Sequence, residues 1–171
     1  MSVIANTTVL TNFAAIGQLD LLRQLFGQLY VTSDVYDEVR QGAEEGYSFF
    51  ADFERYMNPP ASDGWILLTP LSADELRTMR QFPAKLHRGE TSCLAIAHHR
   101  QWRFVSDDQS ARRMADTMRV KFTGTIGCLV LAVTQHVCAL ERANRYLQQM
   151  IESGYYSPVT DLRPLVEQAK G

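Results

Sequence analysis

Short apolar runs alternate along the chain with longer stretches of helical periodicity. The apolar runs predict strands at 3–6, 28–32, 65–69, 102–106 and 120–122. Between them, apolar residues recur at spacings of three and four, which predicts helices at about 12–26, 34–41, 72 onward, 89–100, 108–118, 124–137, 140–154 and 161–169. This alternation favours an α/β fold with a mostly parallel central sheet and helices on both faces.

Local signals mark several helix ends. We expect Gly17 to divide the first helical region into two helices and Gly27 to end it. Ser33 can cap the next helix, and the sequence Ser72-Ala-Asp-Glu75 is a capping box. Residues 43–64 combine aromatic helical turns with the loop "NPPASDG". No repeat or linker interrupts the 171 residues, so we expect a single domain over 1–171.

Composition narrows the class of protein. Hydrophobic residues make up 46% and charged residues 21%, as in a globular domain. No run reaches the roughly 18 apolar residues of a membrane span, and no secretory signal is evident, so the cytoplasm is the expected location. Cys93, Cys128 and Cys138 are expected to be reduced core thiols. With a net charge of −2, polyanion binding would need a local basic patch.

Polar residues follow two of the predicted strands, and acids lie near the starts of two helices. Asn6 ends the first strand, and Asp107 and Asp108 follow the strand at 102–106. Glu90 lies in the first turn of its helix, and Glu38 lies beside the buried face of the helix at 34–41. Ligands of parallel sheets bind beyond the carboxyl ends of the strands. If these side chains meet there, they form a site for a hard divalent cation.

Each residue also has an ordinary structural interpretation. Glu38 could be a solvated helix acid, Glu90 a helix N-terminal charge, and Asn6 a turn residue. One of Asp107 and Asp108 is expected to cap the helix that follows. If the carboxylates do share a crevice without metal, at least one should have a raised pKa.

Four segments together resemble the PIN-domain family, in particular the prokaryotic VapC-type toxin ribonucleases. They are "VIANTTVLTNFAAIGQLDLLRQLFGQLYVTSDVYDEV", "RGETSCLAIAHH", "FVSDDQSARRMA" and "VKFTGTIGCLVLA". Their order and spacing cover nearly the whole chain, with 43–88 as a family-variable region. The resemblance implies a three-layer α/β/α fold and a nuclease that binds Mg²⁺ or Mn²⁺ and cleaves RNA.

The resemblance also implies the site. Catalytic residues would be Asn6, Glu38, Glu90 and Asp108, with Asp107 as a further metal ligand. Thr7, Thr123 and Thr125 would lie in the outer shell of the metal. A cognate antitoxin and a homodimer are the expected partners, and no membrane is. Aromatic residues of 47–66 could serve an interface, although a core role is favoured for most of them (Tyr47, Phe49, Phe50, Phe53, Tyr56 and Trp65).

Asn6 departs from the family pattern, which has an aspartate at the end of the first strand. An amide oxygen can still bind a metal, but it lacks the charge that helps to hold Mg²⁺. Asn6 is either a deliberate isosteric replacement that silences a toxic nuclease, or a natural variant with weakened or absent catalysis. In both cases the predicted metal site is one charge short.

Cations that could hold the RNA backbone flank the two acidic motifs. They are Arg77, Arg80, Lys85 and Arg88 before Glu90, with His87 among them, and Arg112 and Arg113 after Asp108. The alternative for all of them is solvated surface charge. For His98 and His99, a place on the helix surface or in the core is favoured over catalysis.

Two other functional classes remain open. The chain could be a catalytically silent PIN-like domain that binds nucleic acid or protein. A nucleotide-binding or receiver-type domain is less favoured, because neither GxGxxG nor GxxxxGK[ST] occurs.

Overall fold

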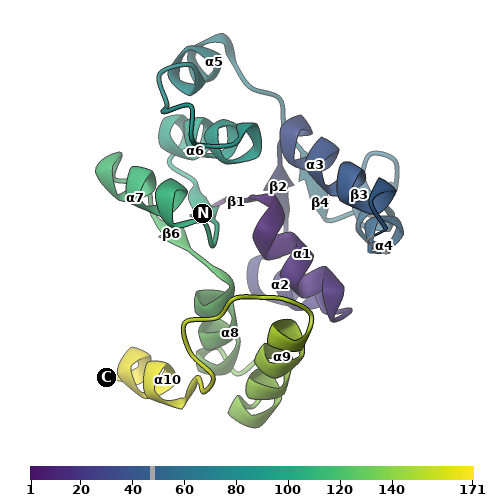
Figure 1. Cartoon of the computed structure of the whole chain (residues 1–171), viewed down its shortest axis with the longest axis vertical. Helices are drawn as coiled ribbons and strands as arrows, with labels where there is room; N and C mark the ends of the chain where they lie inside the picture. The colour runs from purple at the N-terminus through teal and green to yellow at the C-terminus, as the bar shows by residue number, and fades with distance from the viewer. Residues whose placement is uncertain (47–48) are drawn as a thin grey trace.

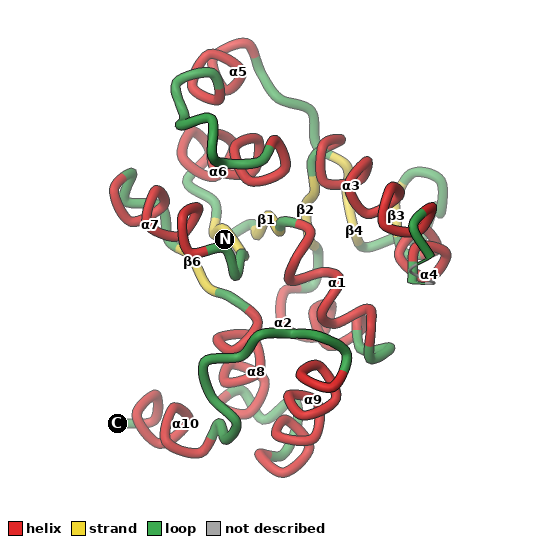
Figure 2. Tube along the Cα trace, in the orientation of Figure 1, coloured by secondary structure: helices red, strands yellow, loops and turns green. Residues whose placement is uncertain are grey.

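A parallel sheet forms the middle of the molecule (Figures 1 and 2). The computed structural model describes residues 1–46 and 49–171. Across these residues six strands pair in the order β3-β4-β2-β1-β5-β6, and all their pairings are parallel. The strands are β1 (Val3–Ala5), β2 (Leu29–Val31), β3 (Met57–Asn58), β4 (Ile66–Leu68), β5 (Arg103–Val105) and β6 (Phe122–Thr123).

Helices connect the strands and close the chain. They are α1 (Thr7–Ala15), α2 (Leu19–Phe26), α3 (Ser33–Glu44), α4 (Phe50–Arg55), α5 (Ala73–Met79), α6 (Arg88–Arg100), α7 (Gln109–Thr117), α8 (Thr125–Thr134), α9 (Leu140–Glu152) and α10 (Arg163–Lys170). No helix in the described ranges is both long enough and apolar enough to cross a bilayer. The chain between α9 and α10 crosses the face of the molecule between α1 and α8 (Figure 1).

The direction of the crossovers reverses at β1. Ile4 of β1 is in register with Tyr30 of β2 on one side and with Phe104 of β5 on the other. The connections from β1 to β2 and from β4 to β5 therefore run across the sheet in opposite directions. Right-handed crossovers then place their helices on opposite faces, which gives the three-layer α/β/α fold. The space beyond β1 and β5 is the switch point, where such folds bind ligands.

The core surrounds the two strands that position the site. All three residues of β1 are buried, and α6 contacts both β1 and β5 with a run of buried residues from Gly89 to Ala97. On α3, Val35 and Val39 are fully buried, as their spacing predicted. The ends of β1 and β5 are therefore held by packing on both faces of the sheet.

Several element boundaries differ from the sequence prediction. The first helix begins at Thr7, directly after the strand, because Asn6 adopts the extended conformation of an N-cap residue. The expected break at Gly17 is confirmed by its φ of 68°. The region assigned to turns and a loop contains the edge strand β3, and the strand expected at 120–122 lies at Phe122–Thr123.

The aromatic residues of the variable region contribute mainly to the core. Phe53 and Trp65 are buried, and Phe49, Phe50 and Tyr56 are partly buried against the core. Tyr47 lies outside the described residues. The favoured core role is therefore confirmed for Phe53 and Trp65.

Candidate active site

Asn6 lies at the carboxyl end of β1, next to the end of β5. Its side chain is 2% exposed. Its Nδ2 donates to Ser106 Oγ at 2.8 Å, and its Oδ1 accepts from Thr8 Oγ1 at 3.0 Å. The backbone N–H of Asn6 donates to Val105 O at 3.0 Å. These contacts fix the amide between the two central strands of the switch point.

Glu38 joins three helices at the same edge of the sheet. The Thr7 hydroxyl donates to Glu38 Oε2, and the backbone N–H of Gly89 donates to Glu38 Oε1 at 3.1 Å. A Cβ at position 89 would lie 2.7 Å from both carboxylate oxygens of Glu38. Gly89 therefore allows the start of α6 to approach the Glu38 side chain of α3 closely.

Glu90 is a buried carboxylate among other acids. It is 7% exposed, and its Oε2 accepts the backbone N–H of His87 at 3.0 Å in a capping box. Burial raises the pKa of Glu90, the negative charges of Asp108 and Glu38 raise it further, and the His87 N–H opposes the shift. The direction of this shift is the one expected for acids that share a crevice, since the charges of Asp108 and Glu38 both act on Glu90.

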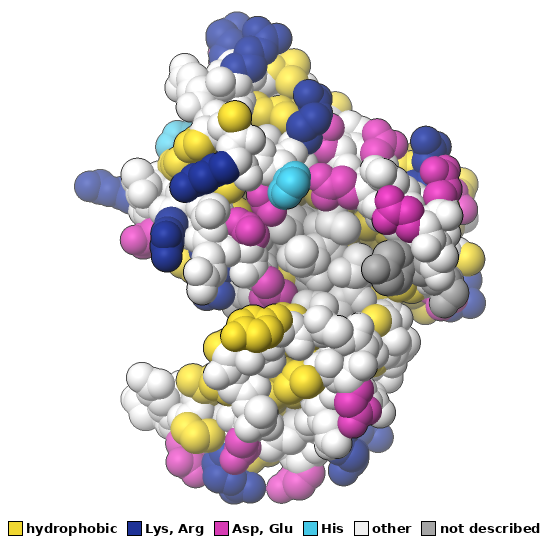
Figure 3. All heavy atoms as spheres, viewed as in Figure 1, with side chains coloured by type: hydrophobic (Ala, Val, Ile, Leu, Met, Phe, Trp, Pro, Cys, Tyr) yellow, Lys and Arg dark blue, Asp and Glu magenta, His cyan; other side chains and the backbone are white. Residues whose placement is uncertain are grey.

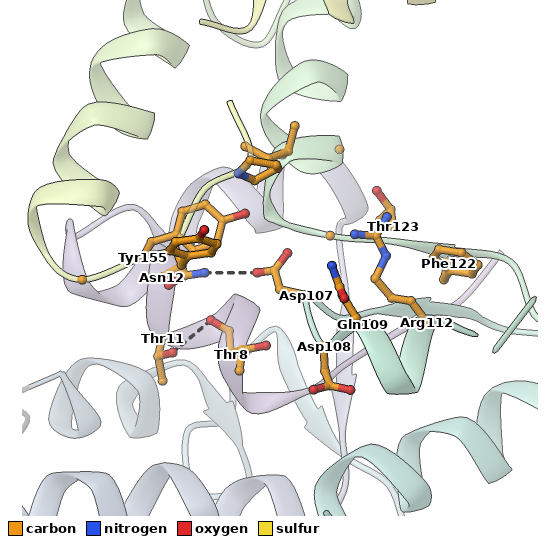
Figure 4. A pocket seen from close by; sticks show the side chains of 16 residues that line it. Thr8, Thr11, Asn12, Asp107, Asp108, Gln109, Arg112, Phe122, Thr123 and Tyr155 are labelled. Atoms are coloured by element: carbon orange, nitrogen blue, oxygen red, sulfur yellow. Dashed lines mark hydrogen bonds between the residues drawn. The ribbon is translucent and has the colours of Figure 1, made fainter. Parts of the chain in front are cut away.

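The two neighbouring aspartates diverge. Asp108 caps α7, because its Oδ1 accepts the N–H of Ala111 at 2.7 Å, and its charge acts on Glu90. Asp107 points away from Asp108 in Figure 4. It accepts hydrogen bonds from Thr125 N at 2.8 Å, Thr125 Oγ1 at 2.5 Å and Asn12 Nδ2 at 3.1 Å. The expected capping role is confirmed for Asp108. Asp107 is directed toward α1 and α8 and away from the other acids.

The predicted outer-shell threonines occupy different places. Thr7 binds Glu38 and so belongs to the acidic edge. Thr125, at the start of α8, binds Asp107 instead. Thr123 lines a cavity beside Asp107, and its hydroxyl would lie 2.0 Å from a Cβ at Gly127.

The donor set fits a hard divalent ion by its chemistry. Asn6, Glu38, Glu90 and Asp108 offer only oxygen to a cation, apart from the Asn6 Nδ2 that Ser106 holds. Within the described residues, no three His, Cys, Asp or Glu side chains lie close enough together to enclose an ion. Mg²⁺ does not require such a cage, because it keeps several waters and binds one or two carboxylates directly.

Basic side chains border the acidic edge. Figure 3 shows Asp and Glu side chains gathered across the middle of one face, above a hollow, with Lys and Arg side chains above and to the left of them. Arg80, Lys85 and Arg113 are exposed, whereas Arg77 pairs with Asp74 and Arg88 Nε with Asp34 at 3.0 Å. Arg112 lies 5.2 Å from the centre of the Phe122 ring.

His98, His99 and the three cysteines lie outside this site, whereas the backbone N–H of His87 binds Glu90. His99 Nε2 shares a hydrogen bond of 2.7 Å with the Thr78 hydroxyl on the surface of α6, in agreement with the favoured non-catalytic role. All three cysteines are free thiols, and burial raises the pKa of Cys93 and Cys128.

Some contributing residues were not anticipated from the sequence. Ser106 and Thr8 orient the Asn6 amide, Asn12 binds Asp107, and Tyr155 lines two cavities beside the site. Ser106 and Thr8 lie one or two residues from predicted site residues, which was the only signal for them. Asn12 and Tyr155 reach the site through tertiary packing alone.

The fold and site together define a class of protein. The fold is an all-parallel α/β/α domain with acidic side chains near its switch point. The chain matches the family model described as PIN domain over residues 2–170, and it belongs to the PIN-domain family. PIN domains are usually nucleases and typically use divalent metal ions. A search of curated proteins finds no significant match to the chain.

Proposed function

We propose that the protein is an endoribonuclease that requires Mg²⁺ or Mn²⁺. The observation that carries this proposal is the buried Glu90 of a PIN-domain fold, on which the negative charges of Asp108 and Glu38 act. A buried acid such as Glu90, whose pKa burial and like charges raise, is typical of a functional site rather than of a structural ion pair.

The side chains at this site would have different roles in such a reaction. Glu90 and Asp108 would hold the ion, and Glu38, fixed by Thr7 and Gly89, would complete the ring of negative charge. A bound divalent ion supplies an activated water and neutralises charge on the phosphate. Ser106 orients Asn6, and the N-terminus of α7 fixes Asp108, so neither group must reorganise when substrate binds.

Substrate binding needs positive charge close to this acidic edge. Arg112 on α7 lies one helical turn from Asp108, and the exposed cations Arg80, Lys85 and Arg113 lie on the two segments that flank the acids. Arg77 pairs with Asp74 on the surface and can exchange this partner for phosphate at little cost. Arg88 pairs with Asp34, whose side chain is only 18% exposed, so its exchange would cost more.

Asn6 lowers the activity in this proposal. Its amide provides one neutral oxygen where a carboxylate would add a full negative charge, which weakens metal binding and the positioning of water. We further propose that the protein acts in the cytoplasm as the toxin of a toxin–antitoxin pair and forms a homodimer. Expression of an active variant without its antitoxin should then slow growth.

The test is Asn6→Asp, which adds one charge with almost no change in shape. We expect tighter Mn²⁺ binding by calorimetry and metal-dependent cleavage of a mixed RNA panel. Cleavage should disappear with chelator and with the added substitution Asp108→Asn. Asn58→Asp is the matched control, since it adds the same charge on β3 at the far edge of the sheet and should gain nothing.

The second candidate function is a catalytically silent binding module, favoured by the neutral Asn6 and by the lack of a closed cage of acids in the described chain. If Asn6→Asp neither binds Mn²⁺ nor cleaves any RNA, the nuclease proposal fails and this candidate replaces it.

A further inference from the structure

A large cavity adjoins the acidic edge on the side away from Glu90. It has a volume of about 850 Å³ and shares Asp108 and Thr8 with the site described above. Its other walls come from α1, α7, the start of α8 and the chain that follows α9. A cavity of this size accommodates a ligand as large as a nucleotide.

The centre of the cavity is preorganised. Asp107 receives three hydrogen bonds, two from Thr125 and one from Asn12, and Asn12 also donates to Thr125 Oγ1 at 3.1 Å. These contacts lock α1 to the start of α8 beneath the cavity. A ligand would therefore meet a fixed polar wall and not a mobile carboxylate.

Aromatic side chains and one arginine contribute further walls. Tyr155 and Arg112 lie on opposite sides of Asp107 in Figure 4. Burial raises the pKa of Tyr155, Asp107 raises it further, and Arg112 lowers it, so the phenol stays neutral between the two charges. Tyr156 also lines the cavity, and 95% of its surface is exposed.

A second cavity continues this surface toward Glu38. It has a volume of about 320 Å³ and is lined by Thr7, Glu38 and Phe49, among others. The two cavities have Thr11, Asn12, Gly154 and Tyr155 in common. A continuous surface therefore runs from Arg112, past the acids and Tyr155, to Glu38.

We infer that the larger cavity is a nucleotide subsite, in which an unpaired base stacks on Tyr156 while Arg112 contacts the adjacent phosphate. Stacking on an aromatic ring tolerates any base and requires that the base be unpaired, since a duplex hides its base faces. Arg112 is held over the Phe122 ring and offers its guanidinium to an anion in the cavity. The inference rests on the proposed ribonuclease function and adds residues of the chain after α9 to the substrate site.

The test measures binding of a fluorescent, unstructured oligoribonucleotide by anisotropy, with Mn²⁺ and with EDTA. Tyr156→Ala should weaken binding roughly five- to a hundredfold, the loss of one stacked base. Tyr156→Phe keeps the ring and should bind like the unaltered chain. Because Tyr156 is almost fully exposed, neither variant should disturb folding.

Arg112→Gln tests the phosphate contact separately. It should weaken binding and reduce the slope of log affinity against log salt by about 0.7, the value for one phosphate on a single strand. Arg145→Gln is the matched control, because Arg145 is exposed on α9 and does not line the cavity, and its slope should stay unchanged.

Each outcome bears on a different proposal. If the unaltered chain and Asn6→Asp bind no RNA at all, both the proposed function and this inference are overturned. If RNA binds but Tyr156→Ala and Arg112→Gln do not change its affinity, only the inference is overturned, and the cavity is then left to a protein partner. Equal losses for single-stranded and duplex RNA in Tyr156→Ala would overturn base stacking.

Discussion

Glu75 and Glu90 occupy the same position in the same local motif, yet their surroundings are opposite. Each is the third residue of a helix, α5 and α6 respectively, and each closes a capping box. Both are nearly fully buried, at 2% and 7% exposure. Glu75 accepts from Arg100 Nε at 2.7 Å and from a second Arg100 nitrogen at 2.8 Å. Glu90 instead accepts the backbone N–H of His87 and lies under the negative charges of Asp108 and Glu38.

The pKa shifts follow this difference. The Arg100 hydrogen bonds hold the pKa of Glu75 below its usual value, whereas burial and then Asp108 and Glu38 hold that of Glu90 above it. The ionised form of Glu75 is therefore favoured in the folded state, whereas the ionised form of Glu90 lowers stability until a cation binds. The helical motif alone therefore does not reveal which glutamate is structural.

Removing the partner of Glu75 should have the largest effect. Arg100→Met leaves a buried carboxylate unpaired and also removes hydrogen bonds to Thr69 Oγ1 and Pro70 O, each 2.8 Å long. We expect the free energy of unfolding to fall by about 2–4 kcal/mol in urea titrations. Arg77→Met is the control, because the Arg77–Asp74 pair is exposed and should contribute less than about 0.5 kcal/mol. Equal losses of unfolding free energy in Arg100→Met and Arg77→Met would contradict the view that the buried Glu75 depends on its partner.

Supplying a cation to Glu90 should have an intermediate effect. In Asn6→Asp, Mn²⁺ at ten times its dissociation constant should raise the free energy of unfolding by about 1.4 kcal/mol, through binding to the folded state alone. A thermal shift assay would measure it. The gain should persist in Asn6→Asp with Glu75→Gln and be lost in Asn6→Asp with Glu90→Gln. A gain that is lost with Glu75→Gln and persists with Glu90→Gln would assign the metal to Glu75 and contradict this prediction.

The smallest effect is a pH dependence of opposite sign at the two acids. The raised pKa of Glu90 means that its ionised form destabilises the fold above that pKa, and the cost disappears below its ordinary value of 4.5. Glu90→Gln should therefore be more stable than the unaltered chain at pH 7, with an advantage that shrinks toward pH 4. Urea titrations in EDTA would show it.

Glu75→Gln should show the opposite behaviour. The lowered pKa of Glu75 gives stability that is present above 4.5 and is lost as pH falls through the folded-state value. Glu75→Gln should be less stable at pH 7 and approach the unaltered chain in acid. The same sign for both glutamine variants would contradict the comparison.

Much of the fold could be predicted from periodicity, because β1, β2, α6 and α8 are long or apolar enough to carry a clear pattern. Strand ends and helix starts indicated where Asn6, Glu90 and Asp108 lie, whereas the grouping of these residues with Glu38 came from the family resemblance and stays a prediction. The edge strand β3 was missed because two residues beside prolines show no period.

The rest of the site depends on contacts between distant segments. Asp107 and Asp108 are adjacent in sequence, but only the positions of α7 and α8 decide which of them faces Glu90. Tyr155 lies far along the chain from β1 and enters the site only because the segment after α9 crosses back between α1 and α8 (Figure 1). No local pattern contains that information.

The central position of β1 has a consequence for synthesis on the ribosome. β1 is the first strand to emerge, but one of its two neighbours, β5, is made about a hundred residues later, and the hydrogen bond from Asn6 to Ser106 spans 100 residues. Until β5 emerges, one edge of β1 stays unpaired. Asp108 follows β5, so it cannot yet lie at the same end of the sheet as Glu90. A nascent chain therefore cannot assemble the acidic site while its N-terminal half alone is exposed.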